Sequence, residues 1–166
     1  LEDLRSPPWV ASSGLKLLSP SIWMASDTVT TGIHNDAPDN LLVQLAGSKD
    51  VTLLRPAELR NLYYVNVSDV QADMELRADG GVDLGGLRVG GRFSSGHSVV
   101  DIFRPGAAAE FPDYAKAQSL TCKLGEGDVL FIPAFWHHAV ATYPDEGRLG
   151  FSLNLWYMHD DRPPTM

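Results

Sequence analysis

The chain has 166 residues, of which 44% are hydrophobic and 20% charged, and its formal net charge is −8. This length and composition are typical of one soluble globular domain and argue against intrinsic disorder. The acidic balance argues against a broad basic surface that would neutralise a phosphate backbone, although it leaves room for local basic patches. Because Cys122 is the only cysteine, an internal disulfide and a zinc site with several thiolate ligands are excluded.

The beginning of the chain shows no targeting signal. Residues 1–8 hold three charges and two prolines, unlike the basic start and apolar middle of a signal peptide. No apolar run approaches the ~20 residues of a membrane-spanning helix, so no membrane association is expected. We predict an intracellular protein, cytoplasmic or nuclear. Because the chain starts without methionine, we expect residues 1–166 to be a single domain that lacks N-terminal elements of a longer protein.

Short β-strands are predicted in the first half of the chain. Residues 1–20 show no clear period and are interpreted as an entry segment or as the end of a lost element. From there, apolar and β-branched residues gather in short segments that turn-forming residues separate; these segments are residues 22–25, 29–36, 40–46 and 51–54. Pro56 ends the last segment, and residues 57–64 are predicted to form one or two helical turns. The pattern indicates consecutive antiparallel strands.

Residues 69–97 differ in composition from the segments on either side. Paired glycines alternate there with Asp, Arg and Ser, which predicts a Gly-rich insertion, either a long loop or a hairpin. Such a segment can serve as a lid or a binding loop, or can simply be solvated. Strand patterns resume afterwards at residues 119–123, 129–133, 136–142 and 149–157. About eight short strands without a sustained helical period favour a barrel or a double-sheet jelly roll.

Candidate metal ligands lie at two places in these strands. His34 and Asp36 are two residues apart on a predicted strand, so both side chains point to one face. Two histidines and one carboxylate form the facial triad of non-haem iron oxygenases, which leaves three coordination positions open. The third ligand is expected from His137 or His138, of which only one can face the same ion. A His-x-Asp triplet alone also arises by chance.

Three sequence blocks resemble the JmjC family of double-stranded β-helix oxygenases. They read TGIHNDAPDNLLVQLAGSKDVTLLRP from Thr31, GDVLFIPAFWHHAV from Gly127 and LGFSLNLW from Leu149. In motif detail they are most similar to the small JmjC hydroxylases of the tRNA wybutosine type. The resemblance implies that residues 1–166 form one all-β domain, a double-stranded β-helix (jelly-roll or cupin-like barrel) with few short helices.

The resemblance also assigns the site residues. The iron ligands fall on His34, Asp36 and His138, the last of which follows Pro133 by five places, whereas His137 becomes a neighbour of the metal. The family's contacts to 2-oxoglutarate fall on four further positions: Thr31, Asn40, Lys49 and Asn154. The implied cofactors are Fe(II), 2-oxoglutarate as co-substrate, and O2.

Lys49 can also be assigned a role on chemical grounds. A dicarboxylate that enters a barrel needs its far carboxylate neutralised, and a cation on the wall supplies a charge-assisted hydrogen bond. Without the neighbouring motif, Lys49 would be interpreted as a solvated lysine after a turn. Strand asparagines such as Asn40 and Asn154 also serve backbone groups, and His97 in its Gly/Ser-rich surroundings is expected to be exposed.

The function implied by the resemblance is Fe(II)- and 2-oxoglutarate-dependent hydroxylation of a macromolecular substrate. The substrate is either a tRNA base of the wybutosine type or a protein side chain. The alternatives are a catalytically inactive cupin-like binding protein and a JmjC lysine demethylase. The intact ligand set and Lys49 argue against an inactive barrel.

Overall fold

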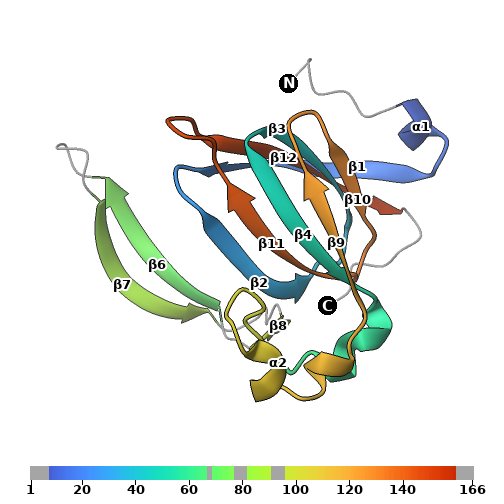
Figure 1. Ribbon diagram of the computed structural model, residues 1–166. Helices are drawn as coiled ribbons and strands as arrows, with labels where there is room; N and C mark the ends of the chain where they lie inside the picture. Colours follow the sequence, from blue (N-terminus) through green and yellow to red (C-terminus); the bar gives the residue numbers. More distant parts are fainter. Residues whose placement is uncertain (1–7, 67–68, 77–81, 91–95, 160–166) are drawn as a thin grey trace.

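The structure, a computed structural model, describes residues 8–66, 69–76, 82–90 and 96–159 (Figure 1). Strands dominate, and the helical segments (α, or η for 3-10) are short. The elements are α1 (Pro8–Ala11), β1 (Leu15–Ala25), β2 (Val29–Asn35), β3 (Asp39–Ala46), β4 (Ser48–Leu54), η1 (Pro56–Asn61), β5 (Tyr64–Asn66), β6 (Asp69–Leu76), β7 (Val82–Gly90), β8 (Gly96–Ser98), α2 (Ala107–Glu110), η2 (Tyr114–Lys116), β9 (Ser119–Leu124), β10 (Val129–Ile132), β11 (His137–Tyr143) and β12 (Gly150–His159).

Two antiparallel sheets form the barrel. One has four strands in the order β1-β12-β3-β10, and the other has six in the order β5-β8-β2-β11-β4-β9 (Figure 1). Most neighbours within a sheet are distant in sequence, as in a jelly roll. The predicted all-β, cupin-like fold with few short helices is confirmed. In the described part of the chain, no helix has the length and hydropathy to cross a membrane.

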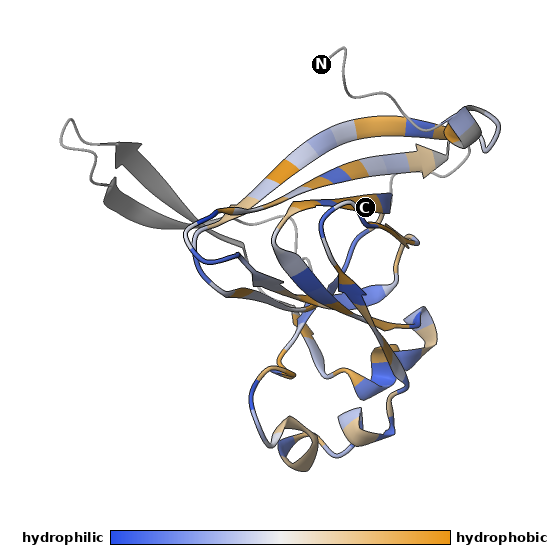
Figure 2. Cartoon of the chain, turned by 45° about the horizontal axis from the view of Figure 1, so that its top comes forward, coloured by the Kyte–Doolittle hydropathy of each residue, from blue (hydrophilic) through white to orange (hydrophobic). Residues whose placement is uncertain are grey.

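The hydrophobic core has three parts, one between the sheets and one on the outer face of each. The part between the sheets consists of Leu42 and Ile132 from one sheet and Val51, Leu53 and Leu124 from the other. The helical segments beyond β4 and β8 cover the outer face of the six-stranded sheet, and α1 reaches the outer face of the four-stranded sheet. Figure 2 shows hydrophobic segments interleaved with hydrophilic ones along the long strands.

Strand β12 shows how the period of two places the site. Leu153, Leu155 and Tyr157 pack outward in the cluster that includes Val10 of α1. The intervening side chains point between the sheets, and they are Ser152, Asn154 and Trp156. Both faces are covered, so polar residues on the inner face need a polar partner or a ligand.

A β-bulge in β2 changes which residues face the interior. Thr31 pairs with Val140 and His34 with His138, so two residues of β2 oppose one of β11. Thr31 and His34 are three residues apart, and in a regular strand they would face opposite sides. With the bulge, both line the space between the sheets, whereas Ile33 is 0% exposed in the outer cluster.

The predicted insertion contains a hairpin. β6 and β7 pair with each other in a separate two-stranded sheet, which stands away from the barrel (Figure 1). The chain then returns through β8, which joins the six-stranded sheet beside β2 and β5. Of the two predicted forms, loop or hairpin, the structure has the hairpin.

The first strand begins earlier than the sequence predicted. β1 begins at Leu15, inside the segment interpreted as an entry segment or the end of a lost element. It pairs with β12 along its length, from Leu15 opposite His159 to Ala25 opposite Gly150. Most of β1 is exposed, so its side chains lack the alternating pattern that marks a half-buried strand.

Candidate metal centre

A cavity of about 380 Å³ lies between the two sheets. Its walls include side chains from β2, β3, β4, β8, β10, β11 and β12, with the end of β1 at one side. The structure brings all seven sequence-predicted site residues to this one cavity: Thr31, His34, Asp36, Asn40, Lys49, His138 and Asn154. These residues span more than a hundred positions of the sequence, and the strand order of the two sheets is what brings them together.

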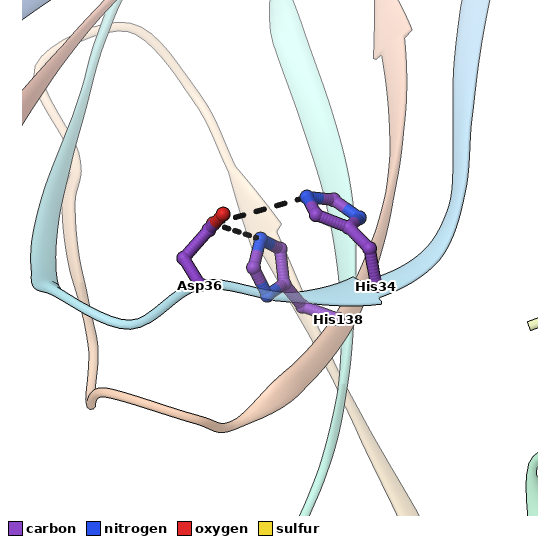
Figure 3. Close-up of side chains that lie close together, drawn as sticks. All are labelled: His34, Asp36 and His138. Carbon is purple, nitrogen blue, oxygen red and sulfur yellow. Dashed lines mark ion pairs between the residues drawn. The ribbon is translucent and has the colours of Figure 1, made fainter. Parts of the chain in front are cut away.

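His34, Asp36 and His138 converge at one point of the cavity wall (Figure 3). The Oδ2 atom of Asp36 lies 3.8 Å from Nε2 of His34 and 3.5 Å from Nε2 of His138. The two histidines are register partners on β2 and β11, and Asp36 follows directly after β2. One ligand atom from each residue lies within 4.8 Å of the others, so a single ion can contact all three.

The hydrogen bonds of the two histidines leave one nitrogen of each ring available. Nδ1 of His34 lies 2.9 Å from the Gly32 carbonyl oxygen, and Nδ1 of His138 lies 3.1 Å from the Trp136 carbonyl oxygen. A carbonyl only accepts, so Nδ1 carries the proton in both rings. Each Nε2 therefore presents a lone pair toward Asp36. Backbone carbonyls orient metal-binding histidines in this way, and the donor set fits a divalent metal.

Burial keeps His138 neutral. Its side chain is 5% exposed. Burial and the nearby His34 lower its pKa from 6.5 to about 4, against an opposing contribution from the Trp136 carbonyl. Near neutral pH its Nε2 is therefore free of a proton and can bind a cation, which metal binding requires.

The metal-free protein is expected to lose stability as the pH falls from 6.5 to about 4. In this window the unfolded chain binds a proton on His138 that the folded chain does not bind, so acid favours unfolding. The urea midpoint of the wild type, measured with a chelator present, should fall more steeply over this range than that of His138→Asn. Parallel pH profiles of the two proteins would contradict the assignment of this shift to His138.

His137 lies on the other side of β11 from the cavity. It is buried, and burial is the main cause that lowers its pKa. Its ring nitrogens contact Tyr64, Asn35 and the backbone carbonyl of Pro56. The structure thus places His138 in the cavity wall and His137 behind it.

Single substitutions at the two histidines should give different results. His138→Ala is expected to remove one of three ligands and abolish stoichiometric Fe(II) binding, measured by anaerobic titration. His137→Ala should still bind one equivalent of iron, with reduced affinity at most, because His137 does not face the cavity. Iron loss in His137→Ala together with retention in His138→Ala would reverse the assignment.

Lys49 lies in the cavity wall, and no other described residue forms an ion pair with it. The residue is 6% exposed, and Nζ donates a 2.6 Å hydrogen bond to Oγ1 of Thr142. Burial lowers the pKa of Lys49, as expected when nothing opposite in charge offsets the loss of hydration. An anion in the cavity would supply that missing partner.

Other polar atoms of the cavity wall are also unsatisfied. Among the described residues, Oδ1 of Asn40, Oγ of Ser152 and Oδ1 of Asn154 are buried without a hydrogen-bond partner. An unsatisfied buried polar group costs about 1–3 kcal/mol. Hydroxyl and amide groups can rotate or flip to donate to a carboxylate. Together with Lys49 and Thr142, they fit a small dicarboxylate such as 2-oxoglutarate.

Sequence reasoning missed several residues of the cavity wall, among them the polar residues Thr142, Ser152 and His97. Thr142 and Ser152 share strand parity with His138 and Asn154, so the period of two was a usable signal for both. His97 was expected to be exposed, and this prediction was wrong. It pairs with His34 across β8 and β2, is half-buried, and stacks on the His34 ring with centroids 5.6 Å apart.

Comparisons with known proteins agree with the fold. A family model described as a cupin-like domain matches residues 2–162. The tRNA wybutosine-synthesizing protein 5 of Homo sapiens is 29% identical over 126 residues, which cover 76% of this chain and 30% of that protein. The bifunctional peptidase and (3S)-lysyl hydroxylase JMJD7 of Homo sapiens is 26% identical over 160 residues, which cover 95% of this chain and 48% of that protein.

A plant relative extends the range of named activities. The lysine-specific demethylase JMJ32 of Arabidopsis thaliana is 27% identical over 144 residues, which cover 82% of this chain and 41% of that protein. The chain thus spans less than half the length of each of these three relatives. The matches confirm the resemblance to small JmjC enzymes that the three sequence blocks predicted.

Proposed function

Because the chain belongs to the cupin-like domain family, we propose that it is an Fe(II)- and 2-oxoglutarate-dependent dioxygenase that hydroxylates a macromolecular substrate. One observation carries this proposal: a two-histidine, one-aspartate cluster shares a cavity with a buried lysine that has no ion-pair partner among the described residues. The histidine and aspartate cluster suits Fe(II), and the lysine suits the far carboxylate of a dicarboxylate. A lysine is costly to bury without a counter-charge, and an anionic ligand would offset that cost.

The side chains divide the work of the site between them. His34, Asp36 and His138 would hold the iron, which when bound supplies the oxygen chemistry that amino-acid side chains lack. Lys49 and Thr142 would bind the far carboxylate of 2-oxoglutarate, with Asn40, Ser152 and Asn154 along its length. Apolar side chains complete the walls and exclude water, and these are Leu42, Ile132 and Val140.

The substrate would reach the metal centre from the side where His34 and Asp36 are partly exposed, with side-chain exposures of 18% and 32%. Trp23, Met24 and Val29 line the other end of the cavity, near Lys49 and Thr142. A cavity of about 380 Å³ admits one group of a macromolecule, not the whole. The named relatives support two substrate classes, a tRNA base and a protein side chain, and a tRNA substrate would require an intracellular location.

Hydroxylation is favoured over lysine demethylation by the charges of the wall. Among the described residues that line the cavity, Asp36 is the only carboxylate, and it belongs to the metal cluster. A methylated lysine carries a positive charge that would find no other anionic partner there. An inactive binding barrel is disfavoured because all three ligands and Lys49 are present.

The proposal is tested by incubating the protein with Fe(II), 2-oxoglutarate and air, together with either a tRNA pool or a peptide pool. Mass spectrometry should detect a gain of one oxygen atom in one of the pools, and Asp36→Asn should abolish it. The pool that gains oxygen identifies the substrate class. Loss of a methyl group from methylated lysine peptides, without oxygen gain in either pool, would instead support the demethylase alternative.

A further inference from the structure

A second polar cluster lies directly behind the metal ligands. Asn35 separates His34 from Asp36 in the sequence, and His137 precedes His138. Asn35 and His137 are register partners on β2 and β11, next to the His34 and His138 pair. Because neighbouring strand residues face opposite sides, these two side chains lie on the outer face of the same two strands. Contacts that hold Asn35 and His137 in place therefore also hold the end of β2 and the start of β11, which carry the metal ligands.

His137 connects this cluster through both of its ring nitrogens. Nε2 lies 3.4 Å from the Pro56 carbonyl oxygen. A carbonyl only accepts, so Nε2 carries the proton and Nδ1 is the acceptor. The Tyr64 hydroxyl donates to Nδ1 at 2.7 Å, and Nδ2 of Asn35 approaches the same atom at 3.3 Å. All the contacts agree with one neutral tautomer, so the orientation of the ring is determined.

Tyr64 is itself held in place from several directions. It is half-buried against the outer cluster of the six-stranded sheet, and its ring lies 5.1 Å from that of His137. Gly96 of β8 packs so closely that an added Cβ would lie 2.9 Å from Cδ1 of Tyr64. Burial raises the pKa of Tyr64, so its hydroxyl keeps the proton that it donates. The hydroxyl is therefore a fixed donor aimed at His137.

We propose that Tyr64, His137 and Asn35 are positioning residues, which hold the ends of β2 and β11 so that His34, Asp36 and His138 stay preorganised for the metal. This inference rests on the metal centre proposed above. None of the three side chains lines the cavity, so they act through the ligands and not on the metal or substrate. Partners outside the ligand shell commonly change metal affinity by about 10–100-fold.

Tyr64→Phe removes one hydroxyl and leaves the ring packing intact. We expect about tenfold or greater loss of Fe(II) affinity in anaerobic titration. The absorption spectrum of the Co(II)-loaded protein, which reports the coordination geometry, should change as well. The matched control is Tyr63→Phe. The Tyr63 hydroxyl donates to Asp113 Oδ2 and accepts from the Asp113 backbone N–H, away from the metal. The Tyr63→Phe variant should be less stable than the wild type but keep the wild-type Fe(II) affinity and Co(II) spectrum.

Substitutions of His137 separate positioning from simple packing. His137→Asn retains an acceptor near the place of Nδ1 and should restore most of the affinity that His137→Leu loses. Equal Fe(II) affinity and equal Co(II) spectra in the wild type, Tyr64→Phe and His137→Leu would overturn the positioning role, as would equal losses in Tyr64→Phe and Tyr63→Phe. A wild type that binds no Fe(II) would instead overturn the metal centre itself.

Discussion

Replacing Asp36 with asparagine is expected to abolish stoichiometric Fe(II) binding. Asp36 supplies the only negative charge of the cluster, and its Oδ2 atom lies 3.8 Å and 3.5 Å from the Nε2 atoms of His34 and His138. The amide keeps the size of the side chain and removes the charge, so the metal would lose the one anionic ligand of the cluster. Anaerobic calorimetric titration of the purified protein with Fe(II) measures this loss directly.

Asp50→Asn serves as the matched control for that experiment. Asp50 lies on β4 and forms a 3.6 Å ion pair with Lys123 outside the cavity. It should bind iron like the wild type, and His34→Ala should lose binding like Asp36→Asn. Unchanged Fe(II) affinity in either His34→Ala or Asp36→Asn would contradict the assigned ligand set.

Replacing Lys49 with methionine is expected to weaken 2-oxoglutarate binding by about ten- to a hundredfold while iron occupancy stays normal. The charge-assisted contact to the far carboxylate is worth about 1.5–3 kcal/mol, which sets this range. Binding of 2-oxoglutarate to the metal-loaded protein under anaerobic conditions measures the effect. Lys123→Met is the control, because Lys123 is exposed and its removal should leave the affinity unchanged.

The same substitution has a second expected outcome that does not depend on catalysis. Burial lowers the pKa of Lys49, so the ligand-free protein holds this charge at an energetic cost. Lys49→Met should therefore fold at least as stably as the wild type when no 2-oxoglutarate is present. A marked loss of stability, together with unchanged co-substrate affinity, would indicate that Lys49 is structural.

The barrel strands were predictable from the sequence because their inner and outer faces differ. In β11, His138, Val140 and Thr142 face the cavity, whereas Ala139 packs outward in the cluster with Ile33. Short buried strands separated by turn residues show this alternation of inward and outward residues in the sequence, whichever strands they pair with. β1 lacks it because it is largely exposed and depends on pairing with β12.

The site residues that lie within the family's sequence motifs were predictable from the spacing of those motifs. The seven predicted residues share one cavity, which the family resemblance implied before any strand order was known. The inward position of Thr31 depends on the bulge opposite Ala139, and a period of two alone would have turned it outward. The position of His97 in the cavity wall depends on the pairing of β8, a three-residue strand after the insertion, with β2. A strand this short leaves no pattern in the local sequence.

Tyr64 and His137 were not predictable as a pair, because 73 residues separate them and only the tertiary pairing of β5 and β8 beside β2 brings them together. Aromatic residues that follow a helical turn are usually packing residues, and nothing local distinguishes Tyr64 from Tyr63. Their hydroxyls find different partners, His137 in one case and Asp113 in the other. That difference exists only in the folded chain.

The central claim is tested most directly by measuring the conversion of 2-oxoglutarate to succinate by the purified protein in air, with and without Fe(II). We expect succinate to form only when Fe(II) is present, to be abolished in Asp36→Asn, and to require higher 2-oxoglutarate concentrations in Lys49→Met. Slow turnover without the macromolecular substrate would suffice, because the metal and co-substrate sites do not depend on it. Succinate formation that is independent of Fe(II) or unchanged in Asp36→Asn, or a protein that binds neither Fe(II) nor 2-oxoglutarate, would contradict it.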